Sequence, residues 1–157
     1  MDAPTTAPTR ALLDAATTPA DGEPLDPAPA SAEVVRFLAR RRSLVVRELG
    51  EPGPDDATLE RLLTLAARVP DHGKLAPWRF VVVAGAARAR LGETIAAAFR
   101  ARQPDAQPPS IEAERGRLAR APVVVAVVSA PVMNPKVPEW EQGLSAGAVC
   151  HQLVLAA

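Results

Sequence analysis

The sequence predicts an α+β fold, with helices packed around a mixed or mostly antiparallel sheet. Segments with the apolar spacing of helices alternate with short β-branched runs, and only two such runs, residues 78–83 and 122–129, have the length and composition of strands. A chain of 157 residues is long enough for one compact domain with its own core. We therefore expect a small sheet covered by helices.

Composition and charge exclude several classes of protein. The 18 basic and 18 acidic residues cancel, so bulk charge gives no attraction to nucleic acid or to a membrane surface. No apolar run reaches the roughly 20 residues that span a bilayer, and the N-terminus lacks the pattern of a secretory signal. The single cysteine, Cys150, rules out an intramolecular disulfide. A cytoplasmic protein without nucleic-acid or membrane partners is expected.

Residues 1–30 are predicted to be a disordered tail rich in proline, alanine and threonine. Five acidic residues against one basic residue give the tail a charge of −4, so residues 31–157 carry +4 because the whole chain sums to zero. Such a segment buries too little apolar area to offset its ordering entropy. The folded domain is therefore expected over residues 31–157, with at most a transient helical turn at residues 10–16.

The first two predicted helices flank a turn rich in proline and glycine. Ser31 can cap a helix whose apolar residues have helical spacing and which runs on into residues 40–43. After the turn, Asp55 or Asp56 can cap a second helix, and Pro70 ends it.

The middle of the chain predicts a strand followed by two helices. The strand covers residues 78–83, and a long helix follows over residues 86–102. A proline-rich loop at residues 103–109 then leads to a short basic helix that ends near Arg120. The apolar face of the long helix is predicted to consist of Leu91, Ile95 and Phe99.

The last predicted elements are a buried strand and a long helix. Residues 122–129 are nearly all apolar, as in a strand that is buried on both faces. The helix over residues 139–157 stops within an apolar stretch and without a capping signal, so the fold is expected to continue beyond residue 157. Cys150 has apolar neighbours in this helix and is expected to be a buried small hydrophobe.

Residues 40–43 (Arg-Arg-Arg-Ser) are the first group that could carry chemistry. Guanidinium groups beside a hydroxyl can grip a phosphate or the ring oxygens of a flavin through charge-assisted hydrogen bonds. The alternative is a solvated basic helix end that complements the helix dipole. Spacing alone favours this alternative.

Two further segments combine polar and rigid residues. Residues 70–78 (Pro-Asp-His-Gly-Lys-Leu-Ala-Pro-Trp) form a stiff polar loop that is suited to presenting groups to a ligand, although His72 can equally be a turn residue. Residues 136–142 (Lys-Val-Pro-Glu-Trp-Glu-Gln) start a helix, and the small residues at 145–148 permit close packing or close approach of a partner chain. An ordinary helix start with a close crossing is the alternative for this third group.

Other chemistries lack support in the sequence. His72, His151 and Cys150 show no metal-ligand spacing, so no metal site is expected. The sequence also contains no phosphate-binding P-loop, no dinucleotide-binding GxGxxG and no GxSxG nucleophile turn.

Taken in order, these segments resemble the nitroreductase family, and in particular its compact bacterial NAD(P)H nitroreductases. Each segment is moderately specific, and their shared order makes chance similarity improbable. The resemblance covers about residues 34–157. The segments that carry it are 41–43 (Arg-Arg-Ser), 67–72 (Ala-Arg-Val-Pro-Asp-His), 77–80 (Pro-Trp-Arg-Phe), 120–122 (Arg-Ala-Pro), 136–142 and 145–147 (Ser-Ala-Gly).

The resemblance implies a nitroreductase fold in an intertwined homodimer with two FMN sites at its interface. In a ping-pong cycle, NAD(P)H would deliver hydride to FMN, which would then reduce a small-molecule acceptor such as a nitro compound or a quinone. Because the flavin performs the redox chemistry, no catalytic side chain is expected. By resemblance, the cofactor-binding residues would be Arg41, Arg42, Ser43, Arg68, His72 and Ala156.

The chain departs from the family pattern in two places. Many relatives carry Asn or Gln in the loop before Pro-Trp, where this chain has Lys74 and Ala76. Relatives also continue with a glycine-rich segment and a Trp-Arg motif that completes the flavin site. The alternative function is therefore a non-catalytic or degenerate flavin-fold module, which binds flavin or another ligand without turnover.

Overall fold

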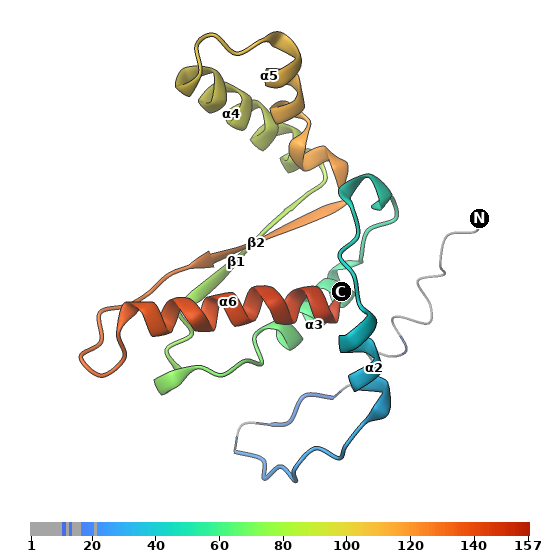
Figure 1. The fold of residues 1–157 in the computed structure, drawn as a ribbon, viewed down its shortest axis with the longest axis vertical. Coiled ribbons are helices and arrows are strands. Elements are labelled where there is room, and N and C mark those ends of the chain that lie inside the picture. The colour runs from blue at the N-terminus through green and yellow to red at the C-terminus, as the bar shows by residue number, and fades with distance from the viewer. Residues whose placement is uncertain (1–10, 12, 14–16, 21) are drawn as a thin grey trace. The chain divides into compact units, whose positions relative to one another are not determined.

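The computed structural model describes residues 11, 13, 17–20 and 22–157, in two compact units that divide at Leu49 and Gly50 (Figure 1). Residues 17–20 and 22–30 form neither helix nor strand. Most of the helical turn proposed at residues 10–16 lies outside the described residues. The boundaries of the tail and the domain therefore remain predictions.

The first unit contains α2 (Ala32–Arg40) and the short 3₁₀ helix η1 (Val46–Glu48). As predicted, Ser31 caps α2, and its Oγ accepts a hydrogen bond from the Val34 N–H at 3.3 Å. The predicted extension of the helix into residues 41–43 is wrong, because Arg41 adopts an extended ψ of 144° and ends the helix. No residue of α2 is buried within the described part of the chain.

The second unit carries the sheet and the remaining helices. Asp55 caps α3 by accepting a hydrogen bond from the Thr58 N–H at 2.8 Å, as one of the two predicted caps. The elements in chain order are α3 (Asp56–Ala66), η2 (His72–Lys74), β1 (Trp78–Ala84), α4 (Ala86–Arg102), α5 (Pro108–Arg115), η3 (Arg117–Arg120), β2 (Val123–Ser129) and α6 (Glu139–Ala156). The helix predicted to end near Arg120 is thus α5 followed by η3, and α5 begins within the predicted proline-rich loop.

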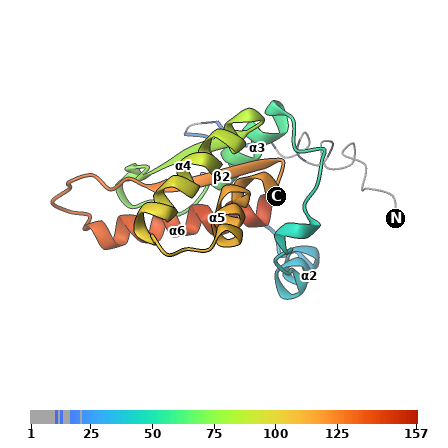
Figure 2. The same ribbon diagram turned by 90° about the horizontal axis from the view of Figure 1, so that it is seen from above.

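The two strands pair antiparallel, from Trp78 opposite Ser129 to Ala84 opposite Val123. They form a two-stranded sheet, and no other strand occurs in the described residues. Helix α6 packs on β2 and on α3, whereas α4 and α5 pack on each other (Figure 2). The predicted α+β class with a small antiparallel sheet is confirmed.

The core of the second unit lies mainly between α3 and α6. Leu62 and Ala66 of α3 and Ala146 and Val149 of α6 are buried there. The prediction that β2 is buried on both faces is wrong: its residues are half-buried or exposed, because a sheet of two strands offers helices too little width to cover both faces fully.

Two predictions about apolar helix faces need correction. On α4 the predicted residues Ile95 and Phe99 are half-buried, but Leu91 is exposed and the buried residues are Gly92 and Ala96. A Cβ atom on Gly92 would lie 2.2 Å from the Arg115 carbonyl oxygen, so α4 and α5 meet backbone to backbone and only small residues fit between them. Cys150 is exposed instead of buried, because α6 turns its Ser145, Ala146 and Val149 face toward the core. No helix in the described residues is long and apolar enough to cross a membrane.

Candidate functional site

The loop before β1 holds an unusual backbone. Gly73, Lys74 and Ala76 all have positive φ, at 76°, 52° and 47°. For side chains other than glycine this conformation is uncommon and costs about 1–3 kcal/mol for each residue unless the surroundings impose it. Strained backbone of this kind clusters at ligand sites, which makes the loop a candidate site.

Hydrogen bonds and packing impose this conformation. The Asp71 carboxylate accepts from the Ala76 N–H at 2.7 Å, and the Asp71 carbonyl accepts from the Lys74 N–H at 3.2 Å. Pro77 is fully buried, and its carbonyl accepts from the Ala130 N–H at 2.9 Å. The loop is therefore anchored at both ends, while its tip, from His72 to Lys74, is exposed, as is Ala76.

The tip of the loop is joined to the start of α6. The Nδ1 atom of His72 lies 2.7 Å from Oε1 of Glu141, two residues into α6. The His72 side chain keeps 60% of its surface exposed and that of Glu141 keeps 31%. The ring is thus held at one nitrogen and open to solvent elsewhere.

Gln142, the next residue, fixes a second loop. Its side chain is 1% exposed, and its Oε1 accepts from the Val132 N–H at 2.9 Å. Its Nε2 donates to the carbonyls of Val132 at 2.8 Å and Val137 at 3.0 Å. Within the same loop, the Asn134 side chain accepts from the Lys136 and Val137 N–H groups at 2.9 and 3.1 Å. The first turn of α6 therefore contacts His72 at the tip of one loop through Glu141 and holds residues 131–137 through Gln142.

Sequence reasoning placed Gln142 in a motif but gave it no role. One signal was present: Gln142 lies four residues before Ala146 and seven before Val149, and thus on the apolar face of α6. A polar side chain on a buried helix face must find hydrogen-bond partners. The partners themselves, in a loop that precedes the helix, follow only from the fold.

The predicted cofactor-binding residues lie in both units. Arg41, Arg42 and Ser43 follow α2 in the first unit, and all three are exposed. The other three belong to the second unit: Arg68 is exposed just after α3, His72 lies at the loop tip, and Ala156 is the half-buried last residue of α6.

Within the second unit, the structure does not bring His72 and Ala156 together. His72 contacts Glu141 near the start of α6, and Ala156 lies 15 residues farther along the same helix (156 − 141). At a rise of 1.5 Å for each residue, this separation is about 22 Å. A site that includes both residues of one chain would have to extend along most of α6.

Several other charged groups of the second unit form surface ion pairs. The carboxylates of Glu112 and Glu93 raise the pKa of the Arg115 guanidinium, and the pair with Glu93 links α5 to α4. This cluster is exposed and structural. Among the described residues, no group of three or more His, Cys, Asp or Glu side chains could hold a metal ion.

A shallow cavity lies beside the loop that Gln142 fixes. Its volume is about 350 Å³, and its lining includes Val132, Met133 and Val137. None of the predicted cofactor-binding residues lines it. It is therefore not the site that the sequence predicts.

Comparison with known proteins gives one consistent family. The model of the nitroreductase family matches residues 38–157. The chain is 34% identical over 125 residues to the Escherichia coli K12 protein named "Putative NAD(P)H nitroreductase YdjA", and 40% identical over 128 residues to a Haemophilus influenzae protein named "Putative NAD(P)H nitroreductase". Each match covers 80% of this chain and 66% of the relative, so the chain spans just under two thirds of the length of these relatives.

A solved structure shows the same fold. The crystal structure of a nitroreductase-like family protein from Bacillus cereus superposes with a TM-score of 0.60 at 19% sequence identity. The superposition covers 83% of this chain and 67% of that protein. At this identity the likeness concerns the fold alone.

Proposed function

This chain belongs to the nitroreductase family, and we propose that it is an FMN-dependent oxidoreductase. It takes hydride from NAD(P)H in one half of a ping-pong cycle and reduces a nitro compound, a quinone or a similar acceptor in the other. The observation that carries the proposal is the anchored, strained loop at residues 71–77, which presents His72 from a fixed frame in a chain of this family.

The chemistry of the proposed binding residues fits FMN. Arg41 and Arg42 are exposed, and neither forms an ion pair within the described residues. Two guanidinium groups with the Ser43 hydroxyl provide the donors that a phosphate or a flavin ring oxygen accepts from. Because these residues follow the C-terminal end of α2, the negative end of the helix dipole opposes an anion there, and the guanidinium charges must supply the attraction.

The flavin supplies the electron transfer when bound, and the side chains of the chain bind and orient it. Arg68 contributes a further exposed cation after α3, and His72 contributes a ring nitrogen at the loop tip. We propose no side chain as general acid or base. A cytoplasmic location, which we also propose, suits the exposed free thiol of Cys150 because thiols stay reduced there.

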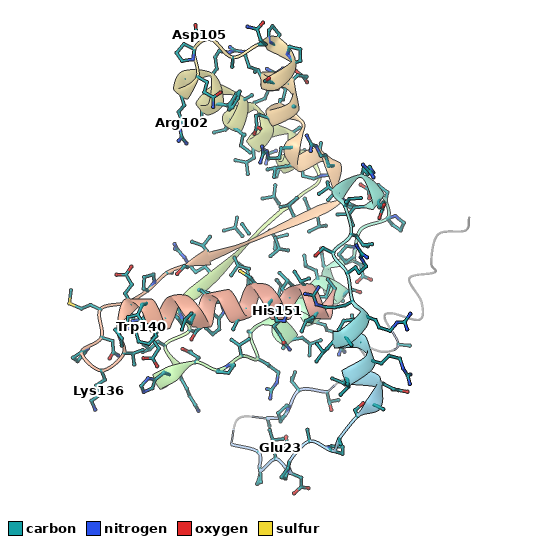
Figure 3. The ribbon with its side chains drawn as sticks, viewed as in Figure 1. Glu23, Arg102, Asp105, Lys136, Trp140 and His151 are labelled. Carbon is teal, nitrogen blue, oxygen red and sulfur yellow. The ribbon has the colours of Figure 1, made fainter. Side chains whose placement is uncertain are left out.

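We further propose that the chain acts as a homodimer. One face of α6 exposes five residues at the alternating four- and three-residue spacing of a helix–helix seam. These residues are Trp140, Leu144, Gly147, His151 and Val154. Trp140 and His151, two of the five, are labelled in Figure 3. Within one chain, His72 lies beside the start of α6 and Ala156 lies at its end. In a dimer, His72 of one copy and Ala156 of the other could bind the same cofactor.

The second candidate function is a flavin-fold module that binds flavin or another ligand without turnover. The observation that favours it is the absence of a side-chain amide at Lys74 and Ala76, the loop positions where many relatives carry one. A measurement of NAD(P)H oxidation with a quinone or nitroaromatic acceptor separates the two functions. Turnover by the FMN-loaded chain would exclude the non-catalytic module.

A pair of arginine variants tests the binding proposal. Arg42→Ala should weaken FMN binding by about 1.5–3 kcal/mol, the usual value of a hydrogen bond to a charged group. Arg36→Ala is the control, because it removes an equally exposed guanidinium from the body of α2. The measurement is a titration of flavin fluorescence at fixed ionic strength. Equal FMN affinities of the two variants would indicate that residues 40–43 are a solvated basic helix end and do not bind the cofactor.

A further inference from the structure

The contact between His72 and Glu141 joins two segments that are 69 residues apart in the sequence. The Nδ1 atom of the ring and Oε1 of the carboxylate lie 2.7 Å apart, which is a short hydrogen-bonding distance. Glu141 is the more covered partner, whereas most of the His72 ring surface faces solvent. The carboxylate is therefore the better fixed group, and the ring is the exposed one.

The chemistry of this contact determines where the ring carries its proton. An ionised carboxylate has only acceptor sites, so the ring nitrogen that faces it must carry hydrogen. In a neutral ring, Nδ1 is then the donor and Nε2 is left with its lone pair. Carboxylates that orient metal-binding histidines set the tautomer in the same way.

We infer that Glu141 is a positioning residue, which holds neutral His72 as the Nδ1–H tautomer so that Nε2 can accept a hydrogen bond from the bound cofactor. The inference rests on the proposed function for the identity of that cofactor. A nitrogen acceptor pairs with an N–H or O–H donor. The flavin group that meets His72 is therefore a ring N–H or a ribityl hydroxyl, and neither a ring carbonyl nor the phosphate.

The loop does not need this contact to keep its shape. The bond from the Ala76 N–H to Asp71 and the buried Pro77 already anchor it. An ion pair with one partner 60% exposed adds little stability of its own. The other contacts of the loop do not define which nitrogen of the His72 ring carries the proton; the contact with Glu141 does.

Nitrogen-15 NMR of the histidine rings tests the tautomer without any cofactor. The chain has only two histidines, and a His151→Gln variant assigns their signals. The spectra are recorded at an alkaline pH beyond which added base no longer changes them, so that both rings are neutral. We expect the wild-type His72 ring to be protonated at Nδ1. A His72 ring protonated mainly at Nε2 would overturn the inference.

Two glutamates in the first turn of α6, Glu139 and Glu141, provide matched variants. Glu141→Gln keeps the length of the side chain, but an amide can donate as well as accept, so we expect His72 to become a mixture of tautomers. Glu139→Gln removes the same charge from the same helix end, and no contact links Glu139 to His72 in the described residues. It should leave the tautomer unchanged. An identical His72 spectrum in the wild type and Glu141→Gln would also contradict the inference.

Titration with FMN then tests the purpose of the contact. Glu141→Gln should weaken FMN binding about three- to tenfold, the equivalent of one hydrogen bond, while Glu139→Gln should bind as the wild type does. If NMR shows the Nδ1–H tautomer in the wild type, and Glu141→Gln nevertheless binds FMN as tightly as the wild type does, the positioning role is refuted. A wild-type chain that takes up no FMN would instead refute the proposed function, and with it the cofactor part of the inference. The tautomer of His72 is decided separately, by the NMR result.

Discussion

Replacing Gln142 by methionine should destabilise the second unit by about 2–4 kcal/mol. Methionine has a similar length and volume, so the change removes hydrogen bonds without opening a large cavity. The three bonds that are lost join the side chain to the Val132 N–H, the Val132 carbonyl and the Val137 carbonyl. A typical hydrogen bond contributes about 0.5–1.5 kcal/mol, and a buried group left without a partner costs about 1–3 kcal/mol.

Packing of the apolar thioether offsets part of this loss, which sets the upper end of the range. The control is Gln152→Met, which makes the same exchange on the same helix at a half-buried residue without a hydrogen bond from its side chain in the described residues. Urea unfolding followed by the fluorescence of Trp78 and Trp140 gives both free energies of unfolding. A loss below about 1 kcal/mol, or equal losses in the two variants, would refute the reasoning.

The same variant should loosen one loop more than the rest of the unit. Because Oε1 of Gln142 accepts from the Val132 N–H, the amide hydrogen of Val132 should exchange faster in Gln142→Met. The Ala130 N–H, which is bonded to the Pro77 carbonyl, should keep a larger share of its protection. Equal acceleration at both amides would mean that Gln142 stabilises the whole unit without anchoring the loop in particular.

Three further perturbations follow from close approach, backbone strain and an exposed face. Gly92→Ala places a methyl group against the Arg115 carbonyl and should cost about 1–3 kcal/mol in urea unfolding, whereas Gly143→Ala, with open space around it, should not. Ala76→Gly relieves the strain of a φ of 47° and should raise the free energy of unfolding by up to about 1 kcal/mol, seen as a higher thermal midpoint. A lower midpoint would contradict this. Leu144→Glu should convert the proposed dimer to monomer in light scattering; an unchanged mass would contradict the α6 interface.

The sequence predicts local structure well where a local signal decides it. Ser31 and Asp55 are predicted caps and are observed caps, because capping depends on residues three apart. Where tertiary packing decides, the prediction fails. On α4, periodicity identified the half-buried Ile95 and Phe99 but also chose the exposed Leu91, and it missed Gly92, which is buried because α4 approaches α5 closely.

The candidate site divides in the same way. His72 was singled out from its rigid, polar loop, and the ordered motifs led to the family that the comparisons identify. The positive φ of Lys74 and Ala76 could not be predicted, since neither residue type favours that conformation. The contact of His72 with Glu141 could not be predicted either, because it depends on the packing of segments far apart in the sequence.

We propose that this chain carries a flavin that NAD(P)H reduces. The most direct measurement is the visible absorption spectrum of the FMN-loaded chain in the absence of oxygen. We predict that added NADH or NADPH bleaches the absorbance of bound flavin, and that a quinone or nitroaromatic acceptor restores it. A chain that takes up no FMN, or bound flavin that neither NADH nor NADPH bleaches, would contradict the claim.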